Sequence, residues 1–314
     1  MRRILLILVA AVLAIAGTTA AAPAAPSVAK APAVVKAPAV VKAPAVVKAE
    51  AATQQYGTHP RQSLNITWNP SPAPRPVVIL ITGGYWYTHA TWGTWEKQFA
   101  DQGFQVFAMK YRLNFEAAWP AQRDDVASAV KWVRDNAERY DADPDNVLLL
   151  GSSAGGQMAT DAATRGTNSL GLKGIVALSP VASPYRAWQD GNTSTNDKIR
   201  KLRDNSTLLA RCYPDPADNS TANRDTGCWD TWRDMESKNA VTKGDAPMLM
   251  VHSDGDFVPP VHSTELEAAA KAAGVPASNV ATRIVTGSTA HGGSLLGTPG
   301  MFDTVVSWLK ARTS

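Results

Sequence analysis

The sequence predicts an α/β domain with a mostly parallel central sheet and helices on both faces. From residue 77 onward, short apolar runs alternate with amphipathic stretches of helical periodicity. Several of these runs are apolar on both faces, as expected of strands that are buried between two helical layers. The chain has 314 residues, of which 45% are hydrophobic. This excludes a disordered tail protein and a polytopic membrane protein, and leaves room for one large globular domain or two small ones.

The expected elements follow one another in strand and helix order. Apolar runs predict strands at residues 77–81, 105–111, 147–150, 175–178, 248–251 and 283–285. Helical periodicity predicts helices that begin at Pro120 and that cover residues 157–164, 263–273 and 302–310. Residues 181–245 interrupt this alternation. We expect them to form a lid-like insertion, because connections of that length are often lids or binding loops.

The first 53 residues have a different character. Two arginines, an apolar run over residues 4–17 and small residues up to residue 22 predict a signal peptide at 1–22. That run is shorter than the roughly 20 residues that cross a bilayer, although an uncleaved anchor is the alternative. Residues 23–53 contain three copies of Lys-Ala-Pro-Ala-Val-Val and predict an extended linker. We therefore expect a secreted or cell-surface protein whose globular α/β domain covers residues 54–314.

The linker has two interpretations. It either holds the domain near a cell wall or membrane, or is a solvated tether without a binding role, which its composition favours.

The net charge of +4 does not indicate nucleic-acid binding. Six of the 31 basic and one of the 27 acidic side chains lie in residues 1–50, so the rest of the chain carries a net charge of −1. No basic stripe remains that could replace the counterions of a phosphate backbone.

The chain has two cysteines, Cys212 and Cys228. In an exported protein they can pair, and the closed loop of roughly 16 residues would stabilise the fold by about 3 kcal/mol. The cysteine and histidine spacings do not suggest a structural zinc site, so no metal is expected.

The expected nucleophile is Ser153. It stands at the centre of Gly151-Ser152-Ser153-Ala154-Gly155-Gly156, which follows one predicted strand and opens a helix. A Gly-x-Ser-x-Gly sequence in this context is typical of a sharp, strained turn that presents the serine hydroxyl. The neighbouring Ser152 is the weaker candidate, since it points elsewhere along the turn.

An acid and a base follow the last two predicted strands. His291 lies in a glycine-flanked loop after residues 283–285, and Asp254 and Asp256 come shortly after residues 248–251. A carboxylate at that place can orient a histidine and stabilise its cation, although either aspartate could simply form a turn beside Gly255. We favour Asp256. Ligands bind at the carboxyl ends of the strands in such sheets, and Ser153, Asp256 and His291 all follow strand ends.

A glycine pair follows the first strong strand. Gly83-Gly84 precedes Tyr85, and glycines allow backbone N–H groups to turn toward a developing oxyanion. The N–H of Ala154, directly after the nucleophile, is the expected second donor.

Together these motifs resemble the α/β-hydrolase superfamily from about residue 77 to the end. The closest group is that of the esterases and lipases whose oxyanion loop reads His-Gly-Gly-Gly, including hormone-sensitive-lipase-like and acetyl or feruloyl esterases. The resemblance implies an α/β-hydrolase fold, the triad order Ser153, Asp256, His291 and oxyanion donors at Gly84, Tyr85 and Ala154. Thr82 replaces the usual His, and Tyr85 replaces the third Gly, which leaves the donor at position 85 open.

The function expected from these residues is hydrolysis of carboxylic esters through an acyl-enzyme, without a cofactor. The substrate is a small-molecule or polymer ester, and the sequence gives neither its acyl length nor the oligomeric state. Aromatic residues are frequent near the oxyanion loop and in the insertion. They either line an acyl or alcohol pocket or pack the loop against the insertion, and the sequence favours neither interpretation.

Two alternatives remain. One is an exported peptidase or amidase of the prolyl-oligopeptidase type, which shares Gly-x-Ser-x-Gly-Gly and the triad order. The other is a catalytically inactive hydrolase-fold binding module, which Thr82 and Tyr85 keep open.

Overall fold

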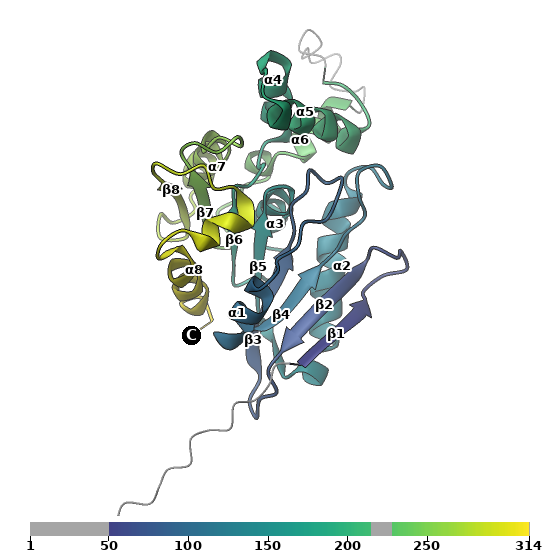
Figure 1. Ribbon diagram of the computed structural model, residues 1–314, viewed down its shortest axis with the longest axis vertical. Helices are drawn as coiled ribbons and strands as arrows, with labels where there is room; N and C mark the ends of the chain where they lie inside the picture. Colours follow the sequence, from purple (N-terminus) through teal and green to yellow (C-terminus); the bar gives the residue numbers. More distant parts are fainter. Residues whose placement is uncertain (1–49, 215–227, 314) are drawn as a thin grey trace, which may run out of the picture. The chain divides into compact units, whose positions relative to one another are not determined.

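The computed structural model describes residues 50–214 and 228–313. The predicted signal peptide and most of the predicted linker lie outside these residues. The described chain forms an eight-stranded sheet with the order β1-β2-β4-β3-β5-β6-β7-β8 (Figure 1). The strands are β1 (Glu50–Gln55), β2 (Ser63–Trp68), β3 (Arg75–Ile81), β4 (Gln105–Met109), β5 (Ala142–Ser152), β6 (Gly174–Leu178), β7 (Met248–Ser253) and β8 (Val280–Val285).

The sheet is parallel from β4 across to β8, and only β1 and β2 run antiparallel to their neighbours. The six predicted strands correspond to β3 through β8, so the predicted α/β class is confirmed. The sequence pattern does not predict β1 and β2. Strand β1 begins at Glu50, inside the segment predicted to be linker, and pairs with β2 along its whole length.

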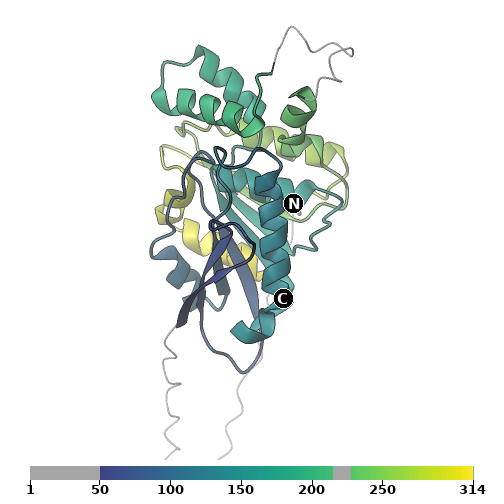
Figure 2. The ribbon, with the colours of Figure 1, turned by 90° about the vertical axis from the view of Figure 1, so that its right-hand side faces the viewer.

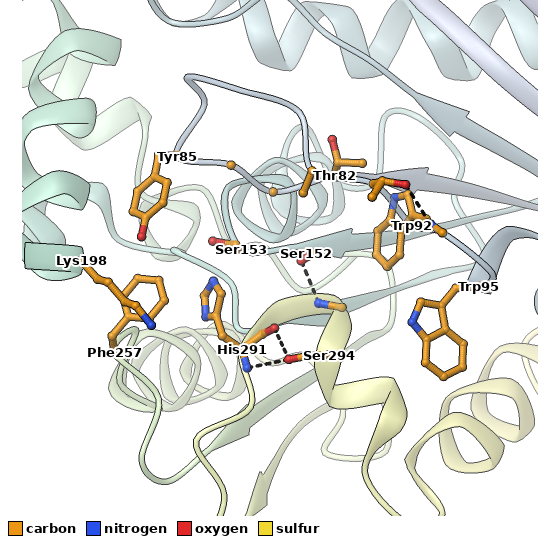
Figure 3. Close-up of a pocket in the computed structure, with 16 residues that line it drawn as sticks. Thr82, Tyr85, Trp92, Trp95, Ser152, Ser153, Lys198, Phe257, His291 and Ser294 are labelled. Atoms are coloured by element: carbon orange, nitrogen blue, oxygen red, sulfur yellow. Dashed lines mark hydrogen bonds between the residues drawn. The ribbon is translucent and has the colours of Figure 1, made fainter.

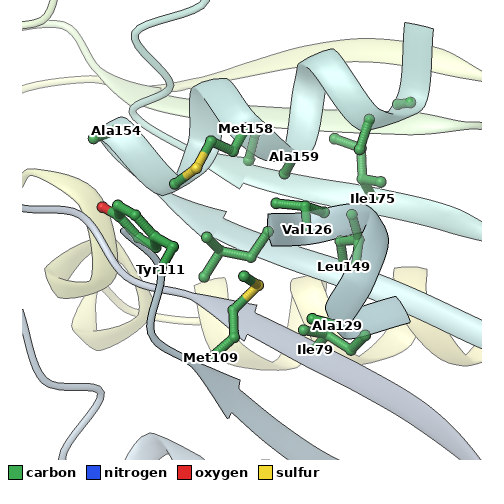
Figure 4. Close-up of a cluster of buried hydrophobic side chains, with 14 of the residues drawn as sticks. Ile79, Met109, Tyr111, Val126, Ala129, Leu149, Ala154, Met158, Ala159 and Ile175 are labelled. Atoms are coloured by element: carbon green, nitrogen blue, oxygen red, sulfur yellow. The ribbon is translucent and has the colours of Figure 1, made fainter. Parts of the chain in front are cut away.

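Helices cover both faces of the sheet (Figure 1). They are α1 (Trp95–Asp101), α2 (Ala121–Asp135), α3 (Ala154–Thr164), α7 (Val261–Ala272) and α8 (Met301–Lys310), with single 3₁₀ turns at Ala137–Tyr140, Ser237–Asn239 and Gly292–Gly297. Successive side chains of a strand point to opposite faces. In β3, Val77, Ile79 and Ile81 belong to the same apolar cluster as buried residues of α2, α3 and α7, whereas Val78 and Leu80 belong to the cluster that includes buried residues of α1 and α8. Figure 4 shows part of the apolar cluster between the sheet and helices α2 and α3. It includes Ile79 and Leu149 from the strands, Val126 from α2 and Met158 from α3.

The segment between β6 and β7 is a helical insertion with α4 (Pro184–Thr193), α5 (Asp197–Ala210) and α6 (Cys228–Asp234). These helices lie together at one end of the sheet (Figures 1 and 2). The predicted disulfide is present: Cys212 and Cys228 are bonded, with Cα atoms 6.0 Å apart. The bond joins the chain after α5 to the start of α6. Whether the insertion acts as a lid stays a prediction.

Within residues 50–214 and 228–313, no helix combines the length and the apolar character needed to cross a membrane.

Candidate active site

Ser153 occupies a strained turn between β5 and α3. Its φ of 55° and ψ of −116° lie in a region that non-glycine residues rarely adopt. The turn requires glycine on both sides. A Cβ at Gly151 would lie 2.2 Å from the carbonyl oxygen of Gly155, and one at Gly155 would lie 2.2 Å from that of Ile81. The sequence therefore folds at this point into the sharp strand-to-helix turn that presents a serine at the end of the sheet.

His291 and Asp256 form a close pair. Nδ1 of His291 lies 2.8 Å from Oδ1 and 3.1 Å from Oδ2 of Asp256. The Asp256 side chain is fully buried, whereas the His291 side chain is 26% exposed. The N–H of Val258 also donates to Oδ1 of Asp256, at 3.1 Å. A proton on Nδ1 that is directed at this carboxylate leaves Nε2 as a hydrogen-bond acceptor.

Ser153 and His291 line one cavity of about 590 Å³. Figure 3 shows the serine side chain and the imidazole ring next to each other on its floor. Within the described part of the chain, no hydrogen bond joins the two side chains. Catalytic hydrogen bonds are often long in the free enzyme and shorten when substrate binds. The lack of a hydrogen bond here therefore does not exclude His291 as the base for Ser153.

The structure separates the two candidate aspartates. Asp254 is exposed, and its carboxylate accepts the N–H groups of Gly287 at 2.9 Å and Ser288 at 3.2 Å. The hydrogen bond from the Gly287 N–H, together with other backbone hydrogen bonds to the carboxylate, lowers the pKa of Asp254. Its carboxylate therefore ties the turn after β7 to the loop after β8. Of the two, only Asp256 contacts His291.

The predicted oxyanion loop follows β3 and runs past Ser153 (Figure 3). Gly84, Tyr85 and Trp86 all have positive φ, at 126°, 60° and 53°. The backbone N–H groups of Gly84, Tyr85 and Ala154 find no acceptor among the described residues. Unpaired N–H groups beside the serine are what an oxyanion needs, and their catalytic use remains a prediction.

The side chain of Trp86 anchors this loop. It is fully buried, and its indole N–H donates to Oε1 of Gln157 on α3 at 3.2 Å. The amide of Gln157 donates in turn to the carbonyl of Met235, at 3.0 Å. The left-handed backbone at Tyr85 and Trp86 is thereby held against the helix that begins at the nucleophile.

Ser179 is a site residue that the sequence analysis missed. It directly follows β6, is fully buried and has a φ of 48°. Its hydroxyl donates to Oδ2 of Asp256 at 2.5 Å and accepts the N–H of Gly292 at 2.9 Å. Ser179 therefore fixes both the acid and the loop that carries His291. Its position after an apolar run was the available signal, since polar residues there face the site.

Ser152, the weaker candidate for the nucleophile, has a structural contact. Its Oγ accepts the N–H of Gly293 at 3.0 Å, which ties the end of β5 to the His291 loop.

The aromatic residues divide between the two predicted roles. Tyr85, Trp92 and Trp95 line the cavity, together with Phe257, which follows Asp256. Within the insertion, Trp188, Trp229 and Trp232 pack around Tyr185 with ring centroids 5.2–6.3 Å from it. Figure 3 shows Tyr85 and Phe257 on one side of Ser153 and His291, and Trp92 and Trp95 on the other. Aromatic side chains therefore line the cavity on both sides of Ser153 and His291.

No group of three or more His, Cys, Asp or Glu side chains within the described ranges is arranged to hold a metal ion.

Comparison with known proteins places these features in context. The BD-FAE family model matches residues 64–199. Esterase LipC of Mycobacterium tuberculosis is 26% identical over 220 residues, which cover 66% of this chain and 51% of LipC. The chain thus spans about half the length of this curated relative. Other relatives are shorter matches, among them a versiconal hemiacetal acetate esterase of Dothistroma septosporum, 33% identical over 106 residues, with 32% of this chain and 31% of that protein covered.

A solved carbohydrate esterase from gut microbiota, in truncated form, superimposes with a TM-score of 0.66. It is 20% identical in sequence, and the match covers 86% of this chain and 99% of that structure. This likeness shows the fold.

Proposed function

Because the chain belongs to the esterase and lipase group of the α/β-hydrolase superfamily, we propose that it is a secreted serine carboxylesterase. The observation that carries the proposal is the arrangement around one cavity: Ser153 on a strained turn, and beside it a histidine paired with a buried aspartate. The relatives named as esterases favour an ester over an amide substrate.

The proposed mechanism uses this geometry directly. Nε2 of His291 takes the proton from Ser153 Oγ as the oxygen attacks the ester carbonyl, while Asp256 stabilises the imidazolium. The backbone N–H groups of Gly84 and Ala154 bind the oxyanion, and that of Tyr85 can assist. His291 then passes the proton to the departing alcohol. Water repeats the sequence on the acyl-enzyme and releases the acid, so the kinetics are ping-pong.

The proposal includes export. Residues 1–22 act as a signal peptide and residues 23 to about 49 as a linker, which ends where β1 begins. The disulfide supports this assignment, because such bonds persist in oxidising compartments. Intact-mass measurement of protein from the culture medium tests it. A mass that still includes residues 1–22 would contradict cleavage.

The decisive experiment is intact-mass analysis after treatment with a fluorophosphonate, with a Ser153→Ala variant as control. We expect one covalent adduct on the parent protein and none on the variant, with kcat on simple esters reduced by several orders of magnitude. Matched ester and anilide substrates then separate esterase from peptidase. A folded parent protein without an adduct would refute the proposed nucleophile and favour the inactive binding module.

A further inference from the structure

One side of the active-site cavity faces helix α5 of the insertion. Lys198 and Lys201 lie one helical turn apart on α5, and Lys198 lines the cavity beside Phe257 (Figure 3). Nζ of Lys198 lies 5.6 Å from the centre of the Phe257 ring, and Nζ of Lys201 lies 4.8 Å from that of Tyr85. Phe257 and Tyr85 stack on each other at 6.1 Å. Two ammonium groups therefore sit over an aromatic pair at the edge of the site.

Neither lysine forms an ion pair within residues 50–214 and 228–313. Among the described residues, no carboxylate lies within 4.0 Å of either ammonium group. The nearby acids of α5 are paired elsewhere, Asp197 with Arg200 and Asp204 with Arg203. The cation–π contacts of exposed lysines are weak and leave the ammonium hydrogens free to bind another group.

The cavity itself contains no accessible negative charge. None of its lining residues is Asp or Glu. The carboxylate of Asp256 is fully buried behind His291 and already accepts three hydrogen-bond donors. An unpaired cation at the mouth of a largely apolar cleft produces a positive potential in it.

Tyr85 adds a neutral donor on the same side. Its side chain points into the cavity (Figure 3), and burial, together with the charge of Asp256, raises its pKa. The phenol therefore remains protonated at ordinary pH and can donate a hydrogen bond to an anion that the lysines attract.

We propose that the site is selective for esters that carry an anionic group, such as a carboxylate, on the part of the substrate that points to α5. Lys198 and Lys201 would bind that group, and Tyr85 and Phe257 would pack against the chain that bears it. The inference rests on the proposed esterase activity and names its substrate class.

The test compares kcat/KM for two matched pairs of esters. In 4-acetoxybenzoate and its methyl ester the charge difference lies on the alcohol part. In 4-nitrophenyl hydrogen adipate and 4-nitrophenyl methyl adipate it lies on the acyl part. We expect the anionic member to be preferred in one pair, which also identifies the part that faces α5. The preference should weaken as salt is added.

Variants then assign the preference to the lysines. Lys198→Gln/Lys201→Gln should reduce the preference in kcat/KM for the anionic ester over its neutral partner about tenfold, the value of one charge-assisted contact. Lys173→Gln is the matched control, because Lys173 is exposed and precedes β6, at the end of the sheet away from Ser153.

The outcomes separate this inference from the proposed function. Hydrolysis of the neutral esters without preference for either anionic partner would overturn the inference and leave the esterase standing. A preference that survives the double variant would likewise overturn it. No hydrolysis of any ester by the folded protein would overturn both.

Discussion

Two aspartates that lie two positions apart have different contacts, and this difference gives the first prediction. Asp256→Asn should lower kcat by about 10⁴-fold, because the amide no longer stabilises the imidazolium and favours the wrong tautomer of His291. Asp254→Asn should leave kcat within about twofold, since the hydrogen bonds of the Asp254 carboxylate go to backbone N–H groups, among them those of Gly287 and Ser288 in the loop after β8. Steady-state kinetics of both variants decide the assignment. A collapse in Asp254→Asn with activity retained in Asp256→Asn would reverse it.

Ser179 gives the second prediction, as a positioning residue that acts through Asp256. Ser179→Ala removes a hydrogen-bond donor to Oδ2 and leaves the N–H of Gly292 without its acceptor. We expect kcat to fall about 10-fold to 100-fold. The carboxylate, having lost a donor, stabilises the imidazolium more strongly, so the acid limb of the kcat/KM profile should move to higher pH.

The control for this variant is Ser152→Ala, which removes a contact to the same loop at Gly293 but none to Asp256. It should leave the pH profile in place. An unchanged profile in Ser179→Ala would reduce Ser179 to a structural role.

The sequence predicted the candidate triad because each member lies within a few residues of the end of an apolar run, and strand ends converge in a parallel sheet. It could not predict Ser179, because a serine after a strand is common and its role depends on side-chain distances across three loops. The left-handed backbone at Tyr85 and Trp86 also gave no signal. It depends on the burial of the Trp86 indole and on its bond to Gln157.

At the scale of elements, burial determined which strands could be predicted. The five residues of β6 are all buried, as are those of β4, and both produce continuous apolar runs. Strand β1 has the polar sequence Glu-Ala-Ala-Thr-Gln-Gln and no buried residue. It is held by pairing with β2, so its own side chains do not reveal it. The helices of the insertion were not predicted individually either.

The disulfide gives a prediction at the same scale. It connects the end of α5 to α6, whose Trp232 is fully buried. Cys212→Ser/Cys228→Ser should lower the free energy of unfolding by about 3 kcal/mol, because the unfolded chain regains the freedom of the closed loop. Urea titration followed by tryptophan fluorescence measures the change.

A reductant provides the control for the disulfide variant. It should shift the midpoint of the parent protein toward that of the variant and leave the variant itself unchanged. Equal midpoints for the oxidised parent and the variant would contradict a stabilising bond.

At the scale of the whole molecule, buried histidines make the free energy of unfolding depend on pH. Burial lowers the pKa of His89 and His252 to about 4 and that of His262 to about 3. Below about pH 6.5 the unfolded chain binds protons that the folded chain refuses, so stability falls as the pH decreases toward these values. Asp161 acts in the opposite direction. Burial raises its pKa to about 6, and the folded chain therefore gains a proton first.

The three histidines outweigh Asp161, so the protein should be less stable at pH 4.5 than at pH 7.5. Urea titrations at the two values measure this difference. His262→Gln should make it smaller, because the variant lacks one of the groups that the unfolded chain protonates. An equal or larger difference in the variant would exclude His262 from the effect.

The order of the strands has a consequence for when the protein becomes reactive. The residues proposed to act together follow β3, β5, β6, β7 and β8, which are neighbours in the sheet but are made in sequence along the chain. Ser153 therefore gains its base only when β8, close to the C-terminus, has docked. In the proposed mechanism, a nascent chain that lacks β8 therefore carries Ser153 without its base. Completion of the fold, rather than synthesis of the serine, would then be the event that assembles the catalytic group.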